Sequence, residues 1–277
     1  MLDTYTLLKQ SRPRFWMYIV GPYVLGIAAA APFPHLFENK YLLLLLLFFT
    51  FPFNYFLYAV NDIFDRDTDA LNSKKKTHEH LVQNTEVRIV AALSAALFVL
   101  SVLLFFWLKQ PLAQFWFFLL LFLSVFYSAP PLRFKARPFF DAYSNILYAL
   151  PGFLSYALIT GQFPTPTLFF AAAFWTAALH TFSAIPDIQA DAQAKIATTA
   201  VSLGKKGALW FVGINWFLAA ILFSLVLGVP GTVFFIYPWF VFALRSASDE
   251  KISAFYWKLP YINTVLGFFG FWYLLIS

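Results

Sequence analysis

Long apolar runs, separated by short polar segments, occupy almost the whole chain. A helix that crosses a bilayer needs about 20 mostly apolar residues, and nine stretches of the sequence approach that length. These stretches are 15–31, 41–61, 87–107, 112–129, 140–160, 167–186, 207–228, 231–245 and 259–276. The pattern predicts an all-α fold, a polytopic membrane bundle of nine transmembrane helices that forms one integral membrane domain over residues 1–277.

Composition excludes several other classes of protein. Hydrophobic residues make up 61% of the chain and charged residues 12%. Soluble domains average about 45–50% hydrophobic and about 25% charged residues. The absence of cysteine excludes thiol catalysis and thiolate metal sites. The net charge of +6 is too diluted by apolar sequence to indicate a nucleic-acid partner. The first apolar run lacks a signal-peptide cleavage pattern and is interpreted as the first span.

The basic residues predict an orientation in the membrane. With nine spans, seventeen of the nineteen lysines and arginines fall on one face, and only Lys40 and Lys109 fall on the other. Because cytoplasmic loops carry an excess of Lys and Arg, the amino terminus is expected in the cytoplasm and the carboxyl terminus outside. An integral, multi-pass protein of the cell (inner) membrane is therefore predicted.

Acidic residues gather in two clusters, each at the predicted cytoplasmic end of an apolar run. The clusters read Asn61-Asp62-Ile63-Phe64-Asp65-Arg66-Asp67-Thr68-Asp69 and Pro186-Asp187-Ile188-Gln189-Ala190-Asp191. If the helix continues through the first cluster, its aspartates at 62, 65 and 69 form one stripe, which Asn54 would extend inward. The two aspartates of the second cluster are four residues apart and would share a helix face.

Such clusters are unfavourable unless something positive binds them. Like charges at helical spacing repel, and the carboxyl end of a helix disfavours negative charge. Mg²⁺ prefers oxygen ligands and is commonly held by carboxylates together with substrate phosphates. Two clusters therefore indicate a magnesium–diphosphate site, and the alternative is a pair of solvated acidic helix ends.

Basic and aromatic residues add two further hints. Cations that could complete a diphosphate site are Lys74, Lys75, Lys76, Arg133, Lys135 and Lys195, although the topology rule alone would also place them here. Aromatic residues make up 22% of the chain, and their ring faces can stabilise an allylic carbocation. Most are expected to face lipid, with Tyr58, Phe64 and Tyr127 the best candidates for a cavity.

These motifs resemble those of the UbiA superfamily of intramembrane prenyltransferases. The first acidic cluster resembles the first motif of that family. The second cluster, with Thr198, Thr199 and Leu203-Gly204 after it, resembles the second motif. Two further matches are the stretch Tyr127-Ser128-Ala129-Pro130-Pro131-Leu132-Arg133-Phe134-Lys135 and the opening Arg12-Pro13.

The resemblance implies a nine-helix bundle that is open sideways to lipid, and a magnesium-dependent prenyl transfer. The implied Mg²⁺ ligands, which are also the implied catalytic residues, are Asn61, Asp62, Asp65, Asp69, Asp187 and Asp191. The expected contacts to the prenyl diphosphate donor are Arg12, Lys75, Tyr127, Ser128, Arg133, Lys135 and Lys195. The acceptor would be a hydrophobic molecule that enters from the bilayer.

The details of the motifs look closer to the lycopene elongase branch, which adds a five-carbon prenyl unit to the ends of a carotenoid. The resemblance lies in Ser11-Arg12-Pro13-Arg14-Phe15-Trp16, in Ala184-Ile185-Pro186-Asp187-Ile188 and in the lysine run. An aromatic quinone precursor or a lipid alcohol is the alternative acceptor. From other classes, a cation-coupled transporter and a non-catalytic isoprenoid carrier remain as alternatives.

Three polar residues in apolar surroundings have more than one interpretation. His180 could face the cavity, but a buried, hydrogen-bonded helix histidine is the preferred interpretation. Asn145 could line the acceptor cavity or bridge helices. Asp141 is interpreted as an acid in the first turn of a helix, where negative charge is favourable.

Overall fold

The computed structural model describes residues 3–30, 40–69 and 80–276, and for residues 67–69 it describes the backbone alone. All regular secondary structure in these ranges is helical, which confirms the all-α prediction. Five helical segments are long and apolar enough to cross a membrane: Lys40–Arg66, Val87–Trp107, Pro166–Gln193, Thr199–Leu227 and Asp249–Ile276. The shorter apolar helices are Met17–Ala30, Pro111–Phe126, Leu150–Thr160 and Val229–Leu244. These helices support a multi-pass membrane protein. The count of nine spans stays a prediction.

The chain divides into two compact units. The first comprises residues 1–132, 147–163 and 260–277, and the second comprises 133–146 and 164–259. The helices of the first unit are α1 (Thr4–Gln10), η1 (Pro13–Phe15), α2 (Met17–Ala30), α4 (Lys40–Phe49), α5 (Phe51–Asp69), α7 (Val87–Trp107), α8 (Pro111–Phe126), α10 (Leu150–Thr160) and most of α16 (Leu259–Ile276).

A close helix contact organises the first unit. Helix α2 packs against α10, and α10 packs against α8. A Cβ atom on Gly26 would lie only 2.1 Å from the carbonyl oxygen of Gly152, so only glycine permits the observed approach of α2 to α10. The Ser155 hydroxyl then donates to the Tyr23 carbonyl across this contact, at 2.8 Å.

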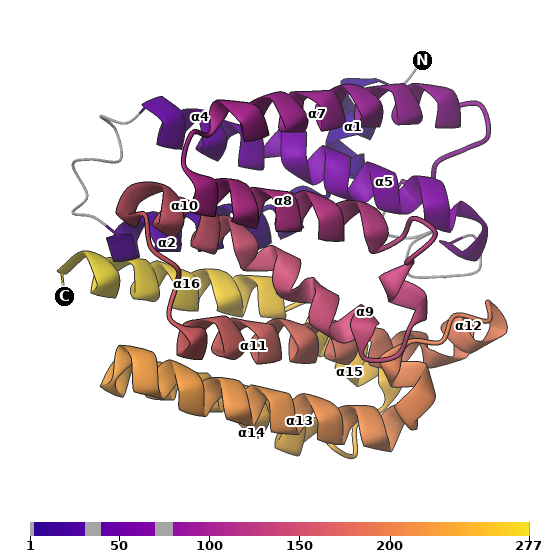
Figure 1. The fold of residues 1–277 in the computed structure, drawn as a ribbon. Coiled ribbons are helices and arrows are strands. Elements are labelled where there is room, and N and C mark those ends of the chain that lie inside the picture. The colour runs from indigo at the N-terminus through magenta and orange to yellow at the C-terminus, as the bar shows by residue number, and fades with distance from the viewer. Residues whose placement is uncertain (1–2, 31–39, 70–79, 277) are drawn as a thin grey trace. The chain divides into compact units, whose positions relative to one another are not determined.

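Helix α5 carries the first acidic cluster and begins where the helical conformation is interrupted at Thr50. The predicted span 41–61 is divided between α4 and α5, which lie on either side of Thr50. The buried Asn54 side chain donates to the carbonyls of Phe49 and Thr50, at 2.8 Å each. Asn54 therefore satisfies backbone carbonyl groups at the point where α4 ends and α5 begins. Helix α5 continues to Asp69, as predicted, and packs against α7 (Figure 1).

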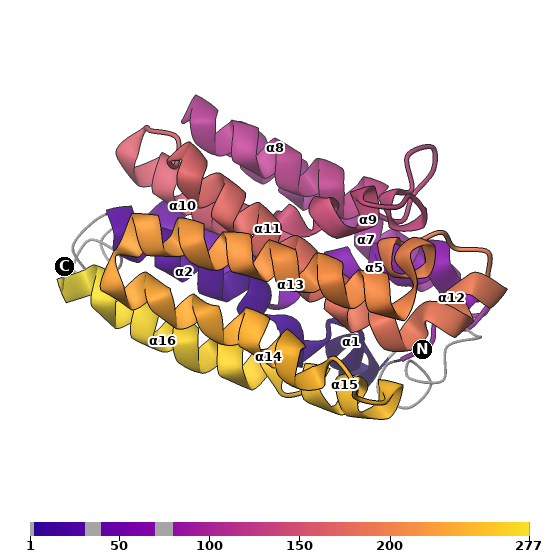
Figure 2. The ribbon, with the colours of Figure 1, turned by 90° about the horizontal axis from the view of Figure 1, so that it is seen from below.

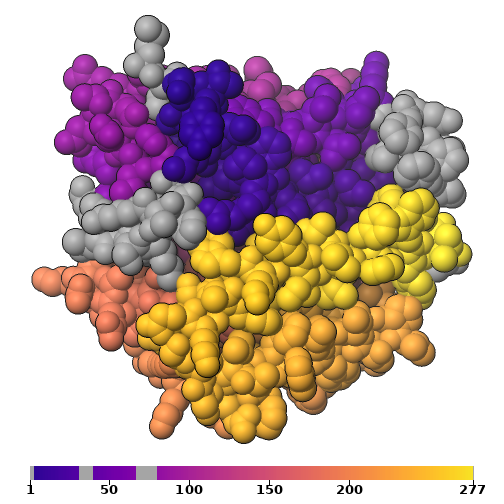
Figure 3. Space-filling view, turned by 180° about the vertical axis from the view of Figure 1, so that it is seen from behind, coloured from indigo at the N-terminus to yellow at the C-terminus, as the bar shows by residue number. Residues whose placement is uncertain are grey.

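Helix α16 covers part of the first unit and coincides with the predicted span 259–276 (yellow in Figure 3). Its Asn263 donates to the hydroxyl of Tyr18 in α2, at 2.9 Å. Its other side bears large exposed apolar side chains, namely Tyr261, Val265, Phe268, Phe269, Trp272 and Ile276. An exposed apolar face of this kind is typical of a helix in contact with lipid.

The second unit is built on a pair of long helices. Helix α11 (Pro166–Ala184) lies along α13 (Thr199–Leu227), and the two run side by side in Figures 1 and 2. The fully buried Phe182 and Trp216 pack against each other in this pair. The other elements of the unit are η2 (Phe134–Ala136), α9 (Phe140–Tyr143), η4 (Ile185–Asp187), α12 (Ile188–Gln193), η5 (Val229–Phe235), α14 (Ile236–Leu244) and α15 (Asp249–Tyr256).

The predicted span 140–160 differs most from the structure. It is not one helix, because the short α9 and a 3-10 segment, η3 (Ser144–Tyr148), precede α10. Asn145 donates from its side chain to the Asp141 carbonyl at 2.6 Å, and Ser144 donates to the same carbonyl at 3.3 Å. These side chains satisfy backbone groups where the helix is irregular. Asn145 thus makes a local backbone contact instead of bridging two helices.

Helix α13 contains a break that only glycine tolerates well. Gly204 has φ 64° and ψ 171°, a combination that is nearly exclusive to glycine. We expect Gly204→Ala to lower the free energy of unfolding by about 1–3 kcal/mol, because the added Cβ makes this conformation unfavourable.

The matched control for Gly204→Ala is Gly213→Ala in the same helix. A Cβ on Gly213 would make only an ordinary contact with Val241, at 3.6 Å, and alanine favours the helix interior. Thermal unfolding in detergent should therefore show a loss for Gly204→Ala alone. Equal behaviour of the two variants would contradict a glycine requirement at position 204.

Candidate active site at two acidic helix ends

The acidic end of α5 brings oxygen ligands together around one serine. Ser128, which follows α8, lies with its hydroxyl 2.6 Å from Asn61 Oδ1 and 2.9 Å from Asp65 Oδ2. Ser128 and Asp65 are each only 1% exposed. The side-chain oxygens of Asn61 and Asp65 therefore converge on a single point, as their spacing of one helical turn predicts.

Asp62 is paired with an arginine from the amino-terminal segment. Arg12 Nη2 lies 2.6 Å from Asp62 Oδ1, and the two side chains are 9% and 6% exposed. The Arg12 guanidinium also stacks over the ring of Tyr58, 4.5 Å from its centroid. Both contacts hold the guanidinium in place, because a buried arginine needs a counter-ion and gains from an aromatic face.

The second acidic cluster lies at the end of α11, and its backbone is less regular than predicted. Asp187 ends the 3-10 turn η4, and Asp191 lies in the short helix α12. Pro186 within η4 lacks the N–H group that a continuous α-helix would use. Asp187 and Asp191 are half-buried. Among the described residues, His, Asp and Glu side chains form no group of three or more that could hold a metal.

Three of the predicted cationic contacts occupy an uncommon backbone conformation. Arg12, Arg133 and Lys195 have φ angles of 52°, 41° and 55°, in the left-handed region that non-glycine residues seldom adopt. Such residues persist where the surrounding structure holds them, and they cluster at functional sites. Lys135 is buried, at 9% exposure, whereas Lys195 is exposed.

The aromatic residues predicted near the site differ in their exposure to solvent. Tyr127 is half-buried directly after α8. Tyr58 is buried beneath Arg12, but Phe64, predicted for the cavity, has 45% of its surface exposed. The side chain of Asp69 and the whole of Lys75 lie outside the described residues.

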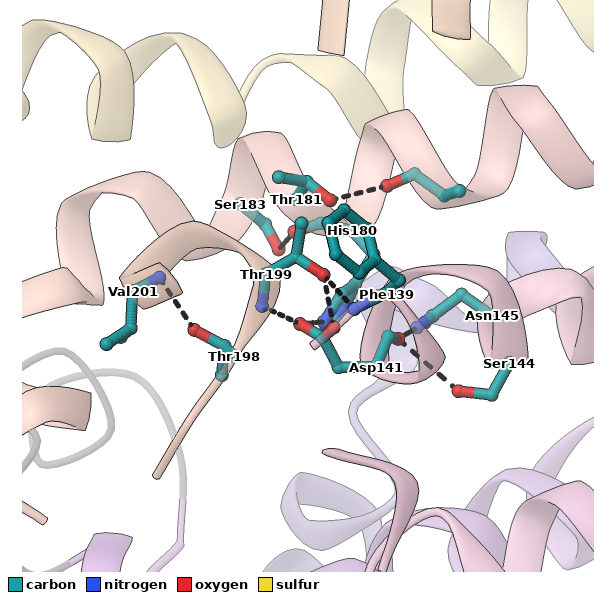
Figure 4. A network of polar contacts seen from close by, with 11 residues as sticks. Phe139, Asp141, Ser144, Asn145, His180, Thr181, Ser183, Thr198, Thr199 and Val201 are labelled. Carbon is teal, nitrogen blue, oxygen red and sulfur yellow. Dashed lines mark hydrogen bonds and ion pairs between the residues drawn. The ribbon is translucent and has the colours of Figure 1, made fainter. Parts of the chain in front are cut away.

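The sequence analysis missed a polar network around Asp141 in the second unit (Figure 4). The Asp141 carboxylate accepts hydrogen bonds from the backbone N–H and the hydroxyl of Thr199. His180 Nε2 lies 3.7 Å from the same carboxylate. Asp141 does lie in the first turn of a helix, as predicted, but its carboxylate binds the start of α13. The charge of Asp141 in an apolar stretch was the available signal.

These features define an integral membrane protein of helical architecture with two acidic helix ends and cations nearby in sequence. The UbiA prenyltransferase family model matches residues 19–275. The chain therefore belongs to the UbiA prenyltransferase family, and the prediction of a prenyltransferase is confirmed. The match does not support the transporter alternative.

Curated relatives share most of their length with the chain. It is 41% identical over 263 residues to a lycopene elongase/hydratase of Haloarcula japonica, and the match covers 94% of the chain and 88% of that protein. It is 40% identical over 257 residues to a lycopene elongase/hydratase of Haloferax volcanii, with 93% and 84% covered. A lycopene elongase/hydratase of Corynebacterium glutamicum is 30% identical over 224 residues, with 78% and 75% covered.

Solved structures share the fold. A UbiA homologue from Archaeoglobus fulgidus, bound to GPP and Mg²⁺, has a TM-score of 0.74 at 23% identity. The match covers 96% of this chain and 99% of the homologue. The same homologue bound to DMAPP and Mg²⁺ gives a TM-score of 0.73.

Proposed function

We propose that the chain transfers a five-carbon prenyl group from an allylic diphosphate to the end of a lycopene-type carotenoid. The allylic C–O bond of the donor breaks, and diphosphate leaves with the electron pair. A terminal double bond of the acceptor then forms the new C–C bond. The resulting cation either loses a proton or adds water, which releases a proton, as the names of the elongase/hydratase relatives suggest.

The arrangement of Asn61, Asp65 and Ser128 is the observation that carries the proposed chemistry. Two hard oxygen ligands converge on one serine hydroxyl, and Asp62 supplies a further carboxylate one residue away. This set of donors fits Mg²⁺, which prefers oxygen ligands. Identity of about 40% along nearly the whole chain supports the carotenoid as acceptor.

We assign the Mg²⁺ ligands to Asn61, Asp62, Asp65, Asp69, Asp187 and Asp191. When bound, Mg²⁺ neutralises the charge that develops on the leaving diphosphate. Ser128 orients Asn61 and Asp65, and Arg12 fixes Asp62. The proposed diphosphate contacts are Arg12, Lys75, Tyr127, Ser128, Arg133, Lys135 and Lys195. The hydrophobic acceptor enters from the bilayer.

We expect Ser128→Ala to weaken magnesium binding about 10–100-fold, the usual effect of removing a group that orients metal ligands. The control is Ser124→Ala, one turn earlier, whose hydroxyl is also buried but donates to the Leu120 carbonyl. Turnover should be measured as a function of Mg²⁺ concentration. If both variants require the same Mg²⁺ concentration as the wild type, Ser128 does not support the metal ligands.

The proposed reaction is tested with the purified chain in lipid vesicles that contain lycopene. Radiolabelled dimethylallyl diphosphate and Mg²⁺ are added, and the pigments are analysed by mass spectrometry. We expect labelled products heavier by five-carbon units, with or without added water. Unchanged lycopene, together with transfer to an added aromatic or lipid alcohol acceptor, would contradict the carotenoid assignment and retain the prenyltransferase.

The orientation is also a proposal, with the amino terminus and the acidic clusters in the cytoplasm. Because the chain has no cysteine, single cysteines can be introduced without background. Lys206→Cys should react only with a membrane-permeant maleimide in whole cells, whereas Lys109→Cys should also react with an impermeant one. The reverse labelling pattern would invert the proposed topology.

A further inference from the structure

We infer that Asp141 is a positioning residue for the prenyl diphosphate site, because it fixes two segments that bear proposed diphosphate contacts. One segment, 133–139, carries Arg133 and Lys135. The other, 192–198, carries Lys195. Both segments are joined to the Asp141 carboxylate through Thr199. The inference rests on the proposed prenyl transfer, since it assigns a role within that site.

Asp141 is fully buried, and its carboxylate accepts more than one hydrogen bond. Its Oδ2 accepts from the Thr199 backbone N–H at 2.9 Å, and its Oδ1 accepts from the Thr199 hydroxyl. Thr199 is itself fully buried. A carboxylate in such surroundings must be hydrogen-bonded or paired, and hydrogen bonds to a charged group are stronger than neutral ones. The carboxylate therefore fixes Thr199 firmly.

The Thr199 hydroxyl extends the connection to the first segment. It donates to Asp141 and accepts from the Phe139 backbone N–H at 2.7 Å. Phe139 has φ 67° and ψ −36°, a conformation that needs support from the surrounding structure. Figure 4 shows Phe139, Asp141 and Thr199 meeting at this point.

From Phe139 back to Arg133 the segment is held by its own backbone. The Ala136 N–H donates to the Arg133 carbonyl at 3.0 Å, and the Asp141 N–H donates to the Arg137 carbonyl at 2.9 Å. These bonds leave the segment little freedom once its end is fixed. The positions of Arg133 and Lys135 thus depend on the bond between Phe139 and Thr199.

The second segment is held between an acidic cluster and the start of α13. At one end, the Ile196 N–H donates to the Asp191 carbonyl at 2.9 Å. At the other end, the Thr198 hydroxyl caps α13 by accepting from the Val201 N–H at 3.1 Å. Thr199, the next residue, is the one that Asp141 binds. Lys195 therefore lies on a short segment whose two ends are fixed.

His180 links the same carboxylate to α11, seven residues before Asp187. Its Nε2 is 3.7 Å from Asp141 Oδ2, and its side chain is 19% exposed. The network in Figure 4 thus includes the helix that leads to the second acidic cluster. Asp141 contacts segments that lead to Arg133, Lys195 and Asp187, and this combination distinguishes a positioning role from simple helix capping.

Thr199→Val gives the cleanest test, because it removes the hydroxyl and keeps the shape and the backbone N–H. We expect KM for the prenyl diphosphate to rise about fivefold, which corresponds to about 1 kcal/mol, with kcat within about twofold of wild type. Thr199→Ser retains the hydroxyl and should restore the wild-type KM. Asp141→Asn should also raise KM, because the charged acceptor is lost.

The control variant is Tyr143→Phe, which removes another hydrogen bond within the same unit. The Tyr143 hydroxyl donates to Asn215 Oδ1 at 2.9 Å, and neither residue belongs to the proposed site. Tyr143→Phe should lower thermal stability as much as Thr199→Val without changing KM. If Thr199→Val lowers the unfolding temperature but leaves KM unchanged, the network is only structural and the inference is wrong.

A double-variant comparison shows whether Asp141 acts through the proposed contacts. If it does, the KM effects of Thr199→Val and Lys195→Ala should combine to less than their product, since coupled residues are not additive. Full additivity in combination with Lys195→Ala, and likewise with Arg133→Ala, would overturn the inference. The turnover of the wild-type protein tests the proposed prenyl transfer. The positioning role of Asp141 is tested separately, by the ratio of each variant's KM to the wild-type KM.

Discussion

Replacing Asp187 by alanine is expected to reduce the turnover of prenyl transfer about a hundredfold to a thousandfold. An effect of this size corresponds to the loss of a main electrostatic contact with the leaving group, about 3–4 kcal/mol. Because Asp187 is only half-buried, the variant should remain folded in detergent. Turnover at saturating Mg²⁺ and thermal unfolding are the two measurements.

Asp249→Ala is the matched control for Asp187→Ala. Asp249 also begins a cytoplasmic helical segment in the proposed topology and is half-buried like Asp187, but it is paired with Lys205 at 2.7 Å. Its removal should leave turnover unchanged. A near-native rate for Asp187→Ala with saturating Mg²⁺ would remove the metal role from the second acidic cluster. Loss of activity in both variants would point to a general effect of charge.

The second large effect is expected at the buried pair of Arg12 and Asp62. Asp62→Ala should abolish turnover and also destabilise the fold by about 3–5 kcal/mol, because it removes a counter-ion that lies 2.6 Å from a buried guanidinium. Asp62→Leu combined with Arg12→Met should restore most of the stability, since apolar replacements of a buried ion pair are often neutral. The double variant should nevertheless stay inactive, because a proposed metal ligand is missing.

The chain offers a matched pair for this experiment. Lys205 and Asp249 lie 2.7 Å apart, close to the 2.6 Å of Arg12 and Asp62, but they are 36% and 47% exposed. Breaking such a partly exposed pair costs about 0–1 kcal/mol. Thermal unfolding of both sets of variants should show this difference. An active double variant at positions 12 and 62 would disprove a role for Asp62 in holding Mg²⁺.

Much of the fold follows from the hydrophobic pattern alone. The predicted spans 87–107 and 259–276 coincide with α7 and α16, because uninterrupted apolar runs form helices that satisfy their own backbone in lipid. The breaks were harder to predict. Thr50 divides one predicted span and residues 144–148 divide another, and in both places side chains such as Asn54 and Asn145 satisfy the backbone groups that become exposed.

In the candidate site, too, the sequence predicted the local helix but not the contacts between distant segments. Sequence spacing predicted that Asp62 and Asp65 lie on a helix, and α5 confirms that helix as far as Asp69. The contacts of Ser128 with Asn61 and Asp65 join positions 67 and 63 residues apart in the chain. The partner of Asp62, Arg12, lies 50 residues away. Spacing along a helix cannot predict partners at such separations.

The sequence by itself determined the class of the protein, its all-α architecture and the residue types of its two acidic clusters. These features depend on composition and on local periodicity, which are properties of short stretches of chain. Only the tertiary structure decided that Arg12 pairs with Asp62, that Ser128 contacts Asn61 and Asp65, and that Asp141 binds Thr199. Each of these contacts requires distant segments to pack together, because a buried polar group must find its partner wherever the fold places one.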